Sequence, residues 1–367
     1  MRRSPTRLGL AVVAAALVAG LPVAGSASAR TLEPIDPAAA PPGGPATIAY
    51  RDRVIDRPTA RAAAFTLRAT AHRYRVPDGR IVEVALSSSF ADTPQNQAGA
   101  QSFVDFLGSR LHGRELSLLR VFIGTNAEIN AACGGDTGVL ACYSRFERRM
   151  YVPDRDPPGG GPFTRDYAVT HEYGHHIAGA RSNYPFSALS YGTKYWASYE
   201  YVCHNTERRR LFPGDQGAHY LQDPGEGFAD AYAHLHYPAA PWQFTPILLP
   251  NPGSFAAIRR DVLTPWVRQV RVPLRGSLGR VRHARSFVQP VSLDGILQLR
   301  LYGPYRSNYD LEVYSRGRLV TRSRAAGSRD RLSVVICRSG IPRIRPVVRV
   351  VRRSGGGGFL VVSAQPD

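Results

Sequence analysis

The pattern of hydrophobic residues changes at Pro265-Trp266, and this change constrains the fold more than any other feature of the sequence. Before it, several stretches carry apolar residues at helical spacing, between shorter runs that alternate like strands. After it come only short alternating runs separated by turn residues. These runs are 270–274, 296–302, 309–314, 331–337, 347–352 and 359–363. We therefore expect an α+β domain over residues 47–264 and a small all-β sandwich over residues 265–367.

The first 29 residues have the features of a secretory signal peptide. Three arginines precede an apolar run over 8–21, and Ala27-Ser28-Ala29 supplies the small residues of a cleavage site. The run is shorter than the roughly 20 residues of a membrane span, although an uncleaved anchor is an alternative. No later stretch is apolar enough to span a bilayer. We expect a secreted protein with no membrane span, in which residues 30–46, rich in Pro, Ala and Gly, form a linker.

The chain is strongly basic. Its formal charge is +19, which becomes +16 once the three arginines of the leader are removed. Lys194 is the only lysine, and the arginines are scattered along the sequence. No helix-turn-helix or zinc-finger pattern accompanies them, so we expect no nucleic-acid partner. Weak attraction to anionic cell-surface polymers remains open.

The four cysteines of an exported chain predict disulfide bonds. Cys133 and Cys142 flank a turn-rich loop and are the preferred pair. Cys203 and Cys337 can then bond to each other, although sequence alone allows three pairings. A four-cysteine zinc site is disfavoured because no Cys-x-x-Cys occurs.

Local patterns in the first domain predict strands followed by helices. Pro77-Asp78-Gly79 is a turn signal between two strand-like runs, which favours a hairpin. Apolar residues at helical spacing predict one helix over 95–111, and another begins near Thr164. The strand-like runs are 65–75, 80–86, 116–123 and 148–152.

The second of these helices carries His171-Glu172-Tyr173-Gly174-His175. Residues four apart lie on nearly the same face of an α-helix, so His171 and His175 can hold one metal ion. The glutamate between them, Glu172, projects beside the open metal position and can take a proton from water there. The sequence therefore predicts a catalytic Zn²⁺ ion with Glu172 as the general base. Two surface histidines on an ordinary helix are the alternative.

A catalytic zinc ion needs a third protein ligand. The longer pattern that ends in a third histidine fails, because Ala178 and Arg181 stand where it requires Gly and His. The other pattern, a glutamate on a second helix, fits Glu226, and Asp230 four residues later can orient a ligating histidine. Asp223 and Glu226 also fit an ordinary helix-capping box, which is the alternative role for this glutamate.

His171-Glu172-x-x-His175 together with Glu226-x-x-x-Asp230 resembles the gluzincin branch of zinc metallopeptidases. The resemblance implies a zincin-like catalytic fold, a mixed sheet over the active-site helix. It also implies that an edge strand, here 148–152, binds an extended protein or peptide substrate. The C-terminal domain is similar to the pre-peptidase C-terminal sandwich of secreted bacterial proteases.

These expectations define a secreted zinc-dependent peptidase that cleaves peptide bonds with a metal-activated water. Such enzymes usually add a Tyr or His donor for the oxyanion, and four residues between the motifs are candidates: His219, Tyr220, Tyr201 and Tyr191. Two alternatives remain, a non-catalytic zincin-like envelope protein for binding or adhesion and a zinc amidase acting on cell-wall material.

Overall fold

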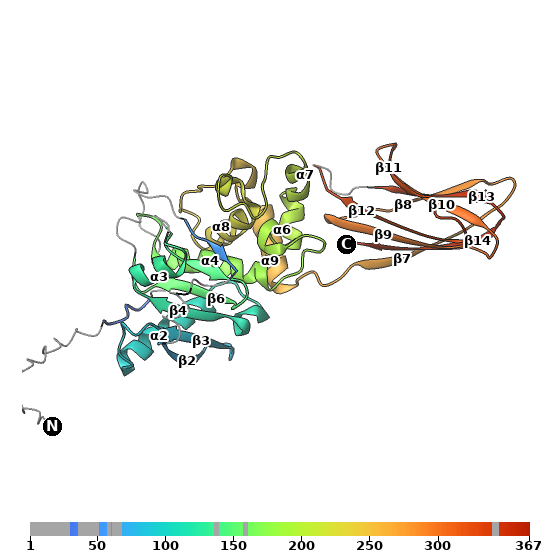
Figure 1. The fold of residues 1–367 in the computed structure, drawn as a ribbon. Coiled ribbons are helices and arrows are strands. Elements are labelled where there is room, and N and C mark those ends of the chain that lie inside the picture. The colour runs from blue at the N-terminus through green and yellow to red at the C-terminus, as the bar shows by residue number, and fades with distance from the viewer. Residues whose placement is uncertain are drawn as a thin grey trace, which may run out of the picture.

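The computed structural model describes residues 30–35, 51–56, 60, 68–135, 139–156, 161–339 and 345–367. The predicted signal peptide and most of the predicted linker lie outside the described residues. Within them, an α/β part extends to helix α9, and two packed β-sheets form the C-terminal part (Figure 1). The expected β-sandwich is therefore present.

A six-stranded mixed sheet runs through the α/β part, with the order β1-β5-β6-β4-β3-β2. Strands β2 and β3 form the hairpin that the turn signal predicted. Strands β3, β4 and β6 are parallel to one another, whereas β5 is antiparallel to β6. Strand β1 then pairs with β5 in parallel at the end of the sheet. The strands are β1 (Val54–Ile55), β2 (Thr70–Arg75), β3 (Ile81–Leu86), β4 (Arg120–Gly124), β5 (Cys142–Ser144) and β6 (Arg149–Pro153).

Helices alternate with the later strands of this sheet along the chain and continue after its last strand. They are α2 (Pro94–Ser109), α3 (Asn126–Ala132), α4 (Arg165–Gly179), α5 (Ala188–Tyr191), α6 (Lys194–Tyr199), α7 (Val202–Glu207), α8 (Pro224–His236) and α9 (Pro252–Leu263), with 3₁₀ turns η1 (Arg114–Leu118), η2 (Tyr220–Gln222) and η3 (Pro246–Leu248). Residues 116–118 of the strand predicted over 116–123 are thus part of η1. Among the helices of the described residues, none is long and apolar enough to cross a bilayer.

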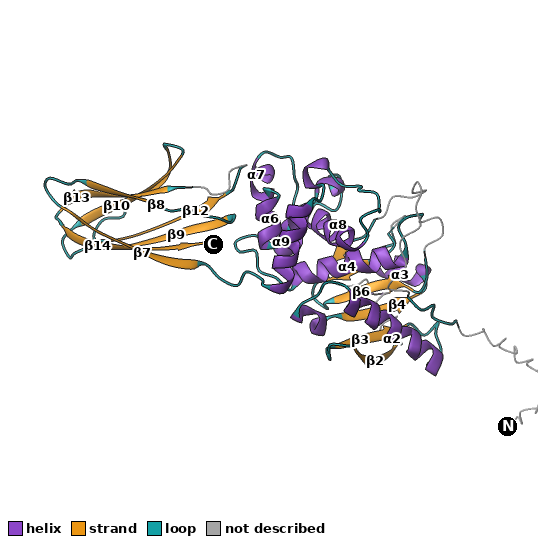
Figure 2. Ribbon diagram, turned by 180° about the vertical axis from the view of Figure 1, so that it is seen from behind, coloured by secondary structure: helices purple, strands orange, loops and turns teal. Residues whose placement is uncertain are grey.

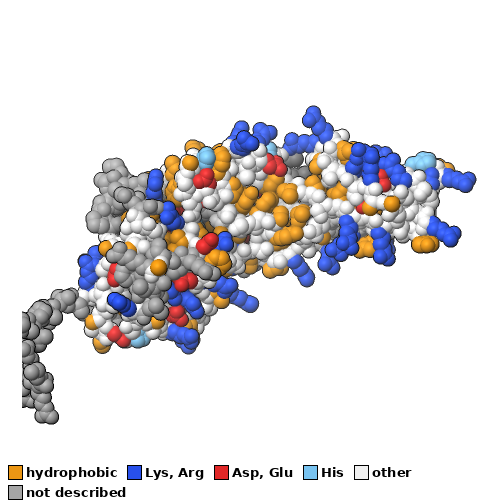
Figure 3. Space-filling model, in the orientation of Figure 1, with side chains coloured by type: hydrophobic (Ala, Val, Ile, Leu, Met, Phe, Trp, Pro, Cys, Tyr) orange, Lys and Arg blue, Asp and Glu red, His pale blue; other side chains and the backbone are white. Residues whose placement is uncertain are grey.

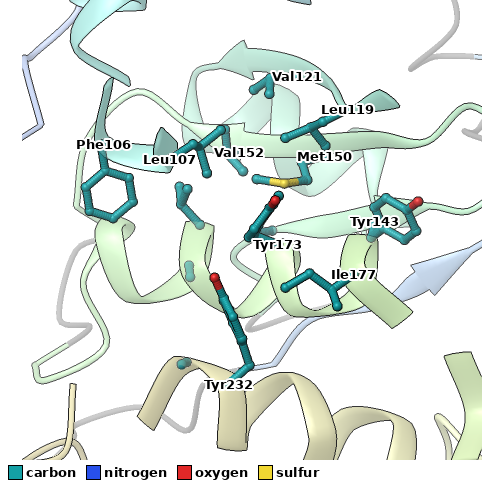
Figure 4. Close-up of a cluster of buried hydrophobic side chains, with 14 of the residues drawn as sticks. Phe106, Leu107, Leu119, Val121, Tyr143, Met150, Val152, Tyr173, Ile177 and Tyr232 are labelled. Atoms are coloured by element: carbon teal, nitrogen blue, oxygen red, sulfur yellow. The ribbon is translucent and has the colours of Figure 1, made fainter. Parts of the chain in front are cut away.

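The core of the α/β part lies between the sheet and α4 (Figure 4). Met150 and Val152 of β6 lie on one side, and Tyr173 and Ile177 of α4 lie on the other, all fully buried. Each such side chain contributes about 1.5–3 kcal/mol when it leaves water. Because the helix turns by 100° per residue, fixing Tyr173 and Ile177 against the sheet directs the two motif histidines to the opposite face of α4.

Two expectations need correction in this part of the fold. The edge strand expected at 148–152 is β6, which lies inside the sheet between β4 and β5. The three-residue strand β5 is too short for a sequence pattern, and a disulfide between Cys133 and Cys142 ties it to the end of α3. Residues 30–35, expected to belong to the linker, instead pack on α2, where Leu32 and Ile35 are buried and Asn96 bonds the backbone of Leu32.

The C-terminal part consists of two four-stranded antiparallel sheets, β11-β10-β13-β8 and β12-β9-β14-β7. Its core comes from alternating residues; in β9, for example, Leu297, Leu299 and Leu301 are buried and their neighbours point outward. Each of the six predicted strands overlaps an observed one. The sequence missed β8 and β11, which bury little apolar surface because both are edge strands. The strands are β7 (Val270–Leu278), β8 (Ala284–Val288), β9 (Gly295–Tyr302), β10 (Asn308–Ser315), β11 (Arg318–Ser323), β12 (Arg329–Ile336), β13 (Val347–Ser354) and β14 (Gly357–Gln365).

The sandwich is joined to helices α6 and α7, on the side of the helices away from the six-stranded sheet (Figures 1 and 2). A disulfide links Cys203 of α7 to Cys337, just after β12. These two cysteines, whose pairing the sequence left open, are therefore bonded to each other. Beside it, the Asp294 backbone N–H donates to Ser198 Oγ at 2.8 Å, and the Arg338 backbone N–H donates to Asp294 Oδ1 at 2.5 Å.

We expect the junction to become less stable as pH rises, because burial raises the pKa of Asp294 to about 7 against the opposing Arg338 backbone N–H. The folded chain then keeps a proton that the unfolded chain releases above about pH 4, so the free energy of unfolding falls between about pH 4 and pH 7 by on the order of 4 kcal/mol. Asp294→Asn removes this loss. Urea unfolding should show the variant gaining on the wild type between pH 5 and pH 8; an equal difference at both pH values would contradict the prediction.

Candidate metal centre

Helix α4 places the two motif histidines together. Thr164 caps it by accepting a hydrogen bond from the Tyr167 backbone N–H, and the helix continues without interruption to Gly179. His171 and His175 lie on one face with ring centroids 5.0 Å apart, and both are completely buried. This is the arrangement that their spacing predicts.

Helix α8 brings the third predicted residue. Asp223 caps its start by accepting from the Gly225 backbone N–H, and Pro224 occupies the first turn. Glu226 does not fold back on the cap, as a capping box would require. Its Oε2 lies 3.2 Å from His175 Nε2 and 3.5 Å from His171 Nε2, so this carboxylate faces both imidazoles.

A glycine lets the two helices approach closely enough for this contact. A Cβ atom on Gly174 would lie 2.8 Å from the Ala229 Cα atom and 3.1 Å from the Ala229 carbonyl oxygen. Real Cβ atoms do not come so near to backbone, so position 174 must lack one for α4 and α8 to pack as they do. Packing therefore requires glycine at the position directly before His175.

A fourth residue, Asp52, completes the cluster, and sequence reasoning missed it. Its Oδ2 lies 2.7 Å from His175 Nε2 and 3.2 Å from His171 Nε2. Its Oδ1 accepts a hydrogen bond of 2.6 Å from the Tyr220 hydroxyl. Asp52 lies 123 residues before His175 and precedes a two-residue strand, so no local pattern marks it.

The four residues could hold a metal ion. Asp52, His171, His175 and Glu226 each offer one nitrogen or oxygen atom, and these atoms all lie within 4.8 Å of one another. All four side chains are buried, so two carboxylates lie close together out of contact with bulk solvent. Buried charges of one sign are costly unless cations balance them. A divalent cation at the centre of the cluster would balance both carboxylates.

The pKa shifts in the cluster also arise from the close contact between buried carboxylates and imidazoles. Burial opposes charge on Asp52, yet the two imidazoles hold its pKa well below the usual value. Burial likewise opposes charge on His175, but Glu226 and Asp52 raise its pKa to about 10. Without a metal the imidazoles therefore keep the protons that neutralise the carboxylates. A bound cation would displace those protons, because it supplies the positive charge itself.

Asp230 lies behind the cluster, one turn after Glu226. Its Oδ1 is 3.4 Å from His171 Nδ1, the ring nitrogen that faces away from Asp52, and it accepts a hydrogen bond from the Tyr167 hydroxyl. Gln216 was not foreseen; its Nε2 donates to Glu226 Oε1 at 3.1 Å. These contacts restrict how the ring of His171 and the carboxylate of Glu226 can turn.

Glu172 is completely buried beside the cluster. Burial and the nearby Asp52 carboxylate raise its pKa well above the ordinary value, against the opposing charge of His175 and His171. A carboxylate with a raised pKa holds a proton more readily near neutral pH. Chemically, that is what a residue needs if it accepts and later returns a proton.

The four oxyanion candidates have different surroundings. Within the described part of the chain, Tyr220 is the one that contacts the cluster, through Asp52. His219 pairs with Asp215 at 2.7 Å and stacks on Phe212. The ring of Tyr191 stacks on Phe186, and the ring of Tyr201 packs under Arg338 at the junction with the sandwich. Nothing in the sequence separates Tyr220 from the other three.

A cavity of about 780 Å³ adjoins the centre. Its wall includes Gln216, which bonds Glu226, together with β1 residues Val54 and Ile55 and the α5 residue Leu189. A larger cavity, of about 1010 Å³, is lined by residues from β2, β3 and the start of β4. The four cluster residues line neither cavity, but the smaller one lies nearer to them, because its wall includes the Gln216 that bonds Glu226.

Sequence comparison identifies no relative: no known protein family and no curated protein matches the chain. Two similar solved structures each match about a quarter of it. The pre-peptidase C-terminal domain of a collagenase from Bacillus anthracis is 11% identical, with a TM-score of 0.23, over 26% of this chain and 89% of that one. PorU from Porphyromonas gingivalis is 15% identical, with a TM-score of 0.17, over 28% of this chain and 13% of that one.

Proposed function

We propose that the chain is a secreted zinc-dependent peptidase. His171, His175 and Glu226 would be the zinc ligands, and Glu172 the general base. The observation that carries the proposal is the convergence of the two imidazoles and the Glu226 carboxylate, with Glu172 on the same helix beside them. Two disulfides and the leader-like first 29 residues support export.

The donor set suits zinc. Two imidazole nitrogens and one carboxylate oxygen are the protein ligands of many catalytic zinc sites, which keep a fourth position for water or substrate. Asp230 behind His171 supplies the hydrogen-bond partner that a ligating histidine usually has. A site built only from hard oxygen ligands would favour Mg²⁺ or Ca²⁺ instead.

The residues of this chain would then share the work of hydrolysis. A bound zinc ion would polarise the scissile carbonyl and lower the pKa of the attacking water. Glu172 would take the proton from that water and deliver it to the leaving amine. The Tyr220 hydroxyl now donates to an oxygen of Asp52. With a substrate carbonyl in that place, the same hydroxyl would donate to the developing oxyanion.

An extended peptide is the substrate that the sheet favours. On the side away from β6, strand β5 pairs with the two-residue strand β1, and an extended peptide that took the place of β1 would use the same main-chain groups. The adjoining cavity would receive the side chains of the substrate on the same side as Glu226.

Metal analysis together with a substrate panel tests the proposal. Purified wild type and Asp52→Ala chains should each bind about one zinc ion, and at least one of them should cleave casein or a quenched fluorescent peptide. The matched control is His171→Ala, which should lose both zinc and cleavage. Cleavage of cell-wall material in place of peptides would identify an amidase instead. Zinc binding without any hydrolysis would favour a binding or adhesion protein, and absence of zinc would refute the proposal.

A further inference from the structure

We propose that residues 51–56 keep the metal centre closed, with Asp52 as a fourth ligand in the position that water and substrate need. This inference rests on the proposed function and adds a means of regulation to it. The Oδ2 atom of Asp52 is closer to His175 Nε2, at 2.7 Å, than the Oε2 atom of Glu226 is, at 3.2 Å. Its side chain is completely buried. Four protein ligands fill a tetrahedral zinc site, whereas a catalytic site keeps one position open.

The backbone of the same segment occupies the edge of the sheet. Val54 and Ile55 pair in parallel with β5. The N–H groups of Leu140, Tyr143 and Arg145 donate to carbonyl oxygens of the segment at 3.0, 3.1 and 3.0 Å. These are main-chain groups that an extended substrate would use. Residues 51–56 and a substrate therefore compete for the strand edge as well as for the metal.

A third contact fixes the carboxylate. The Tyr220 hydroxyl donates to Asp52 Oδ1 at 2.6 Å, which leaves Oδ2 toward the histidines. The hydroxyl that would stabilise an oxyanion is thus engaged by Asp52. One short segment therefore occupies three features that a substrate requires. They are the open metal position, the strand edge and the Tyr220 hydroxyl donor.

Cobalt substitution tests this arrangement directly. Wild type and Asp52→Ala chains are loaded with Co²⁺, and their visible absorption is compared. We expect Asp52→Ala to change the spectrum, because water replaces a carboxylate, and to release the metal faster to a chelator. With zinc bound, peptide cleavage by Asp52→Ala should exceed that of the wild type at least tenfold. Asp52→Asn, of nearly the same shape, repeats the test if the alanine variant folds poorly.

Asp56→Ala is the matched control. Asp56 belongs to the same segment, but its carboxylate is exposed and pairs with Arg145 at 2.7 Å. This variant should match the wild type in spectrum and cleavage. An unchanged cobalt spectrum in Asp52→Ala and Asp52→Asn would overturn the inference and leave the proposed function standing, as would a changed spectrum with no gain in cleavage over an active wild type. If no chain cleaves any substrate, the proposed function and the closing role both fail, and the spectrum still decides whether Asp52 is a ligand.

A second, independent observation concerns the sandwich. Residues 265–367 carry 20 arginines and five acidic residues, a net charge of +15, whereas residues 30–264 have a net charge of only +1. Figure 3 shows Lys and Arg side chains gathered over the sandwich end of the molecule. Five of these arginines lie on one surface, the outward face of sheet β12-β9-β14-β7. This arginine face consists of Arg271, Arg275, Arg300, Arg329 and Arg331.

The arginine face has no acidic residue to balance it. Arg331 lies directly opposite Arg300, and Arg329 and Tyr302 form the next pair on the same face. Like charges placed opposite each other destabilise a sheet. Among the described residues, none of the five arginines takes part in an ion pair, and none of the outward positions of these four strands is Asp or Glu. Folding does not require this arrangement, which points to an anionic ligand.

We infer that the arginine face binds a linear polyol-phosphate polymer of the cell surface. Outward residues repeat about every 6.8 Å along a strand and neighbouring strands lie about 4.8 Å apart. Arg300, Arg329 and Arg331 therefore form a close group, and Arg271 and Arg275 lie beyond the apolar outward residues of β14, so the face can contact several phosphates of one polymer. Arginine forks suit phosphate oxygens. Tyr302 is the one aromatic ring among these outward positions, so the face lacks the stacking platforms that single-stranded nucleic acid uses.

Titration of the full chain with poly(glycerol phosphate) at several salt concentrations tests this surface. The double variant Arg300→Gln/Arg331→Gln should bind at least tenfold more weakly and show a shallower salt dependence. The control, Arg318→Gln/Arg322→Gln on β11 of the other sheet, removes the same charge and should stay within about twofold of the wild type. Equal losses in both variants, no binding at physiological salt, or tighter binding of single-stranded DNA would each overturn the inference.

Discussion

Replacing Glu172 by glutamine in the Asp52→Ala chain is expected to lower kcat/KM for peptide cleavage at least ~10³-fold without loss of bound zinc. Glutamine has the same shape but cannot accept a proton, and general-base catalysis contributes about 10²- to 10⁴-fold. The zinc content should not change, because His171, His175 and Glu226 remain. The Asp52→Ala background keeps the measurement independent of the closing segment.

Glu200→Gln is the matched control for this experiment. Glu200 is also a buried glutamate whose pKa burial raises, to about 7, but it lies on the α6 side of the molecule. Its replacement should leave kcat/KM within about twofold, since it removes a carboxyl without touching a base. Equal rates for Glu172→Gln and its parent would exclude Glu172 as the base.

The parts of the site that sequence could predict obey local rules. The spacing of His171 and His175 places both on one helix face, and the cap residues Thr164 and Asp223 mark where α4 and α8 begin. These relations depend on 3.6 residues per turn and on unsatisfied N–H groups at helix starts, so a single stretch of sequence contains them. The alternating strands of the sandwich core follow from a period of two in the same way.

The parts that sequence could not predict depend on the packing of distant segments. Asp52 reaches the histidines only because β1 joins the sheet beside β5, and neither strand is long enough to show a pattern. Tyr220 could be separated from His219 only by the turn η2, which directs one side chain inward and leaves the other on the surface. The sequence also placed the sheet edge wrongly at 148–152, because β5 and β1, which lie beyond that strand, are too short to show a pattern.

The arginine face of the sandwich could not be predicted from the sequence for a different reason. The five arginines of the face look scattered along the sequence, because β7 and β12 contribute two each and β9 contributes one. Only the register of β7, β9 and β12 places them on one face. The register of an antiparallel sheet is set by turns and by the buried face, and a sequence reading that identifies strands without pairing them cannot recover it.

Gly174→Ala should destabilise the fold by about 2 kcal/mol or more and weaken zinc binding at the same time. Helix propensity alone favours alanine over glycine by about 1 kcal/mol, so the sign of the effect tests the packing. The new Cβ atom would meet the Ala229 backbone of α8 at 2.8 Å, and backbone cannot move aside as a flexible side chain can. The two helices must separate, which draws Glu226 away from His175.

Urea unfolding and competition with a zinc chelator measure the two effects of Gly174→Ala. Gly217→Ala is the control, because its Cβ would have as its nearest neighbour Asp215 Oδ1 at 3.4 Å, an ordinary contact in the loop before η2. The control should keep its stability within about 0.5 kcal/mol and its zinc affinity unchanged. A Gly174→Ala chain as stable as the wild type would show that α4 and α8 need no such close approach. Stability lost without loss of zinc affinity would show that the distance between Glu226 and the histidines does not depend on it.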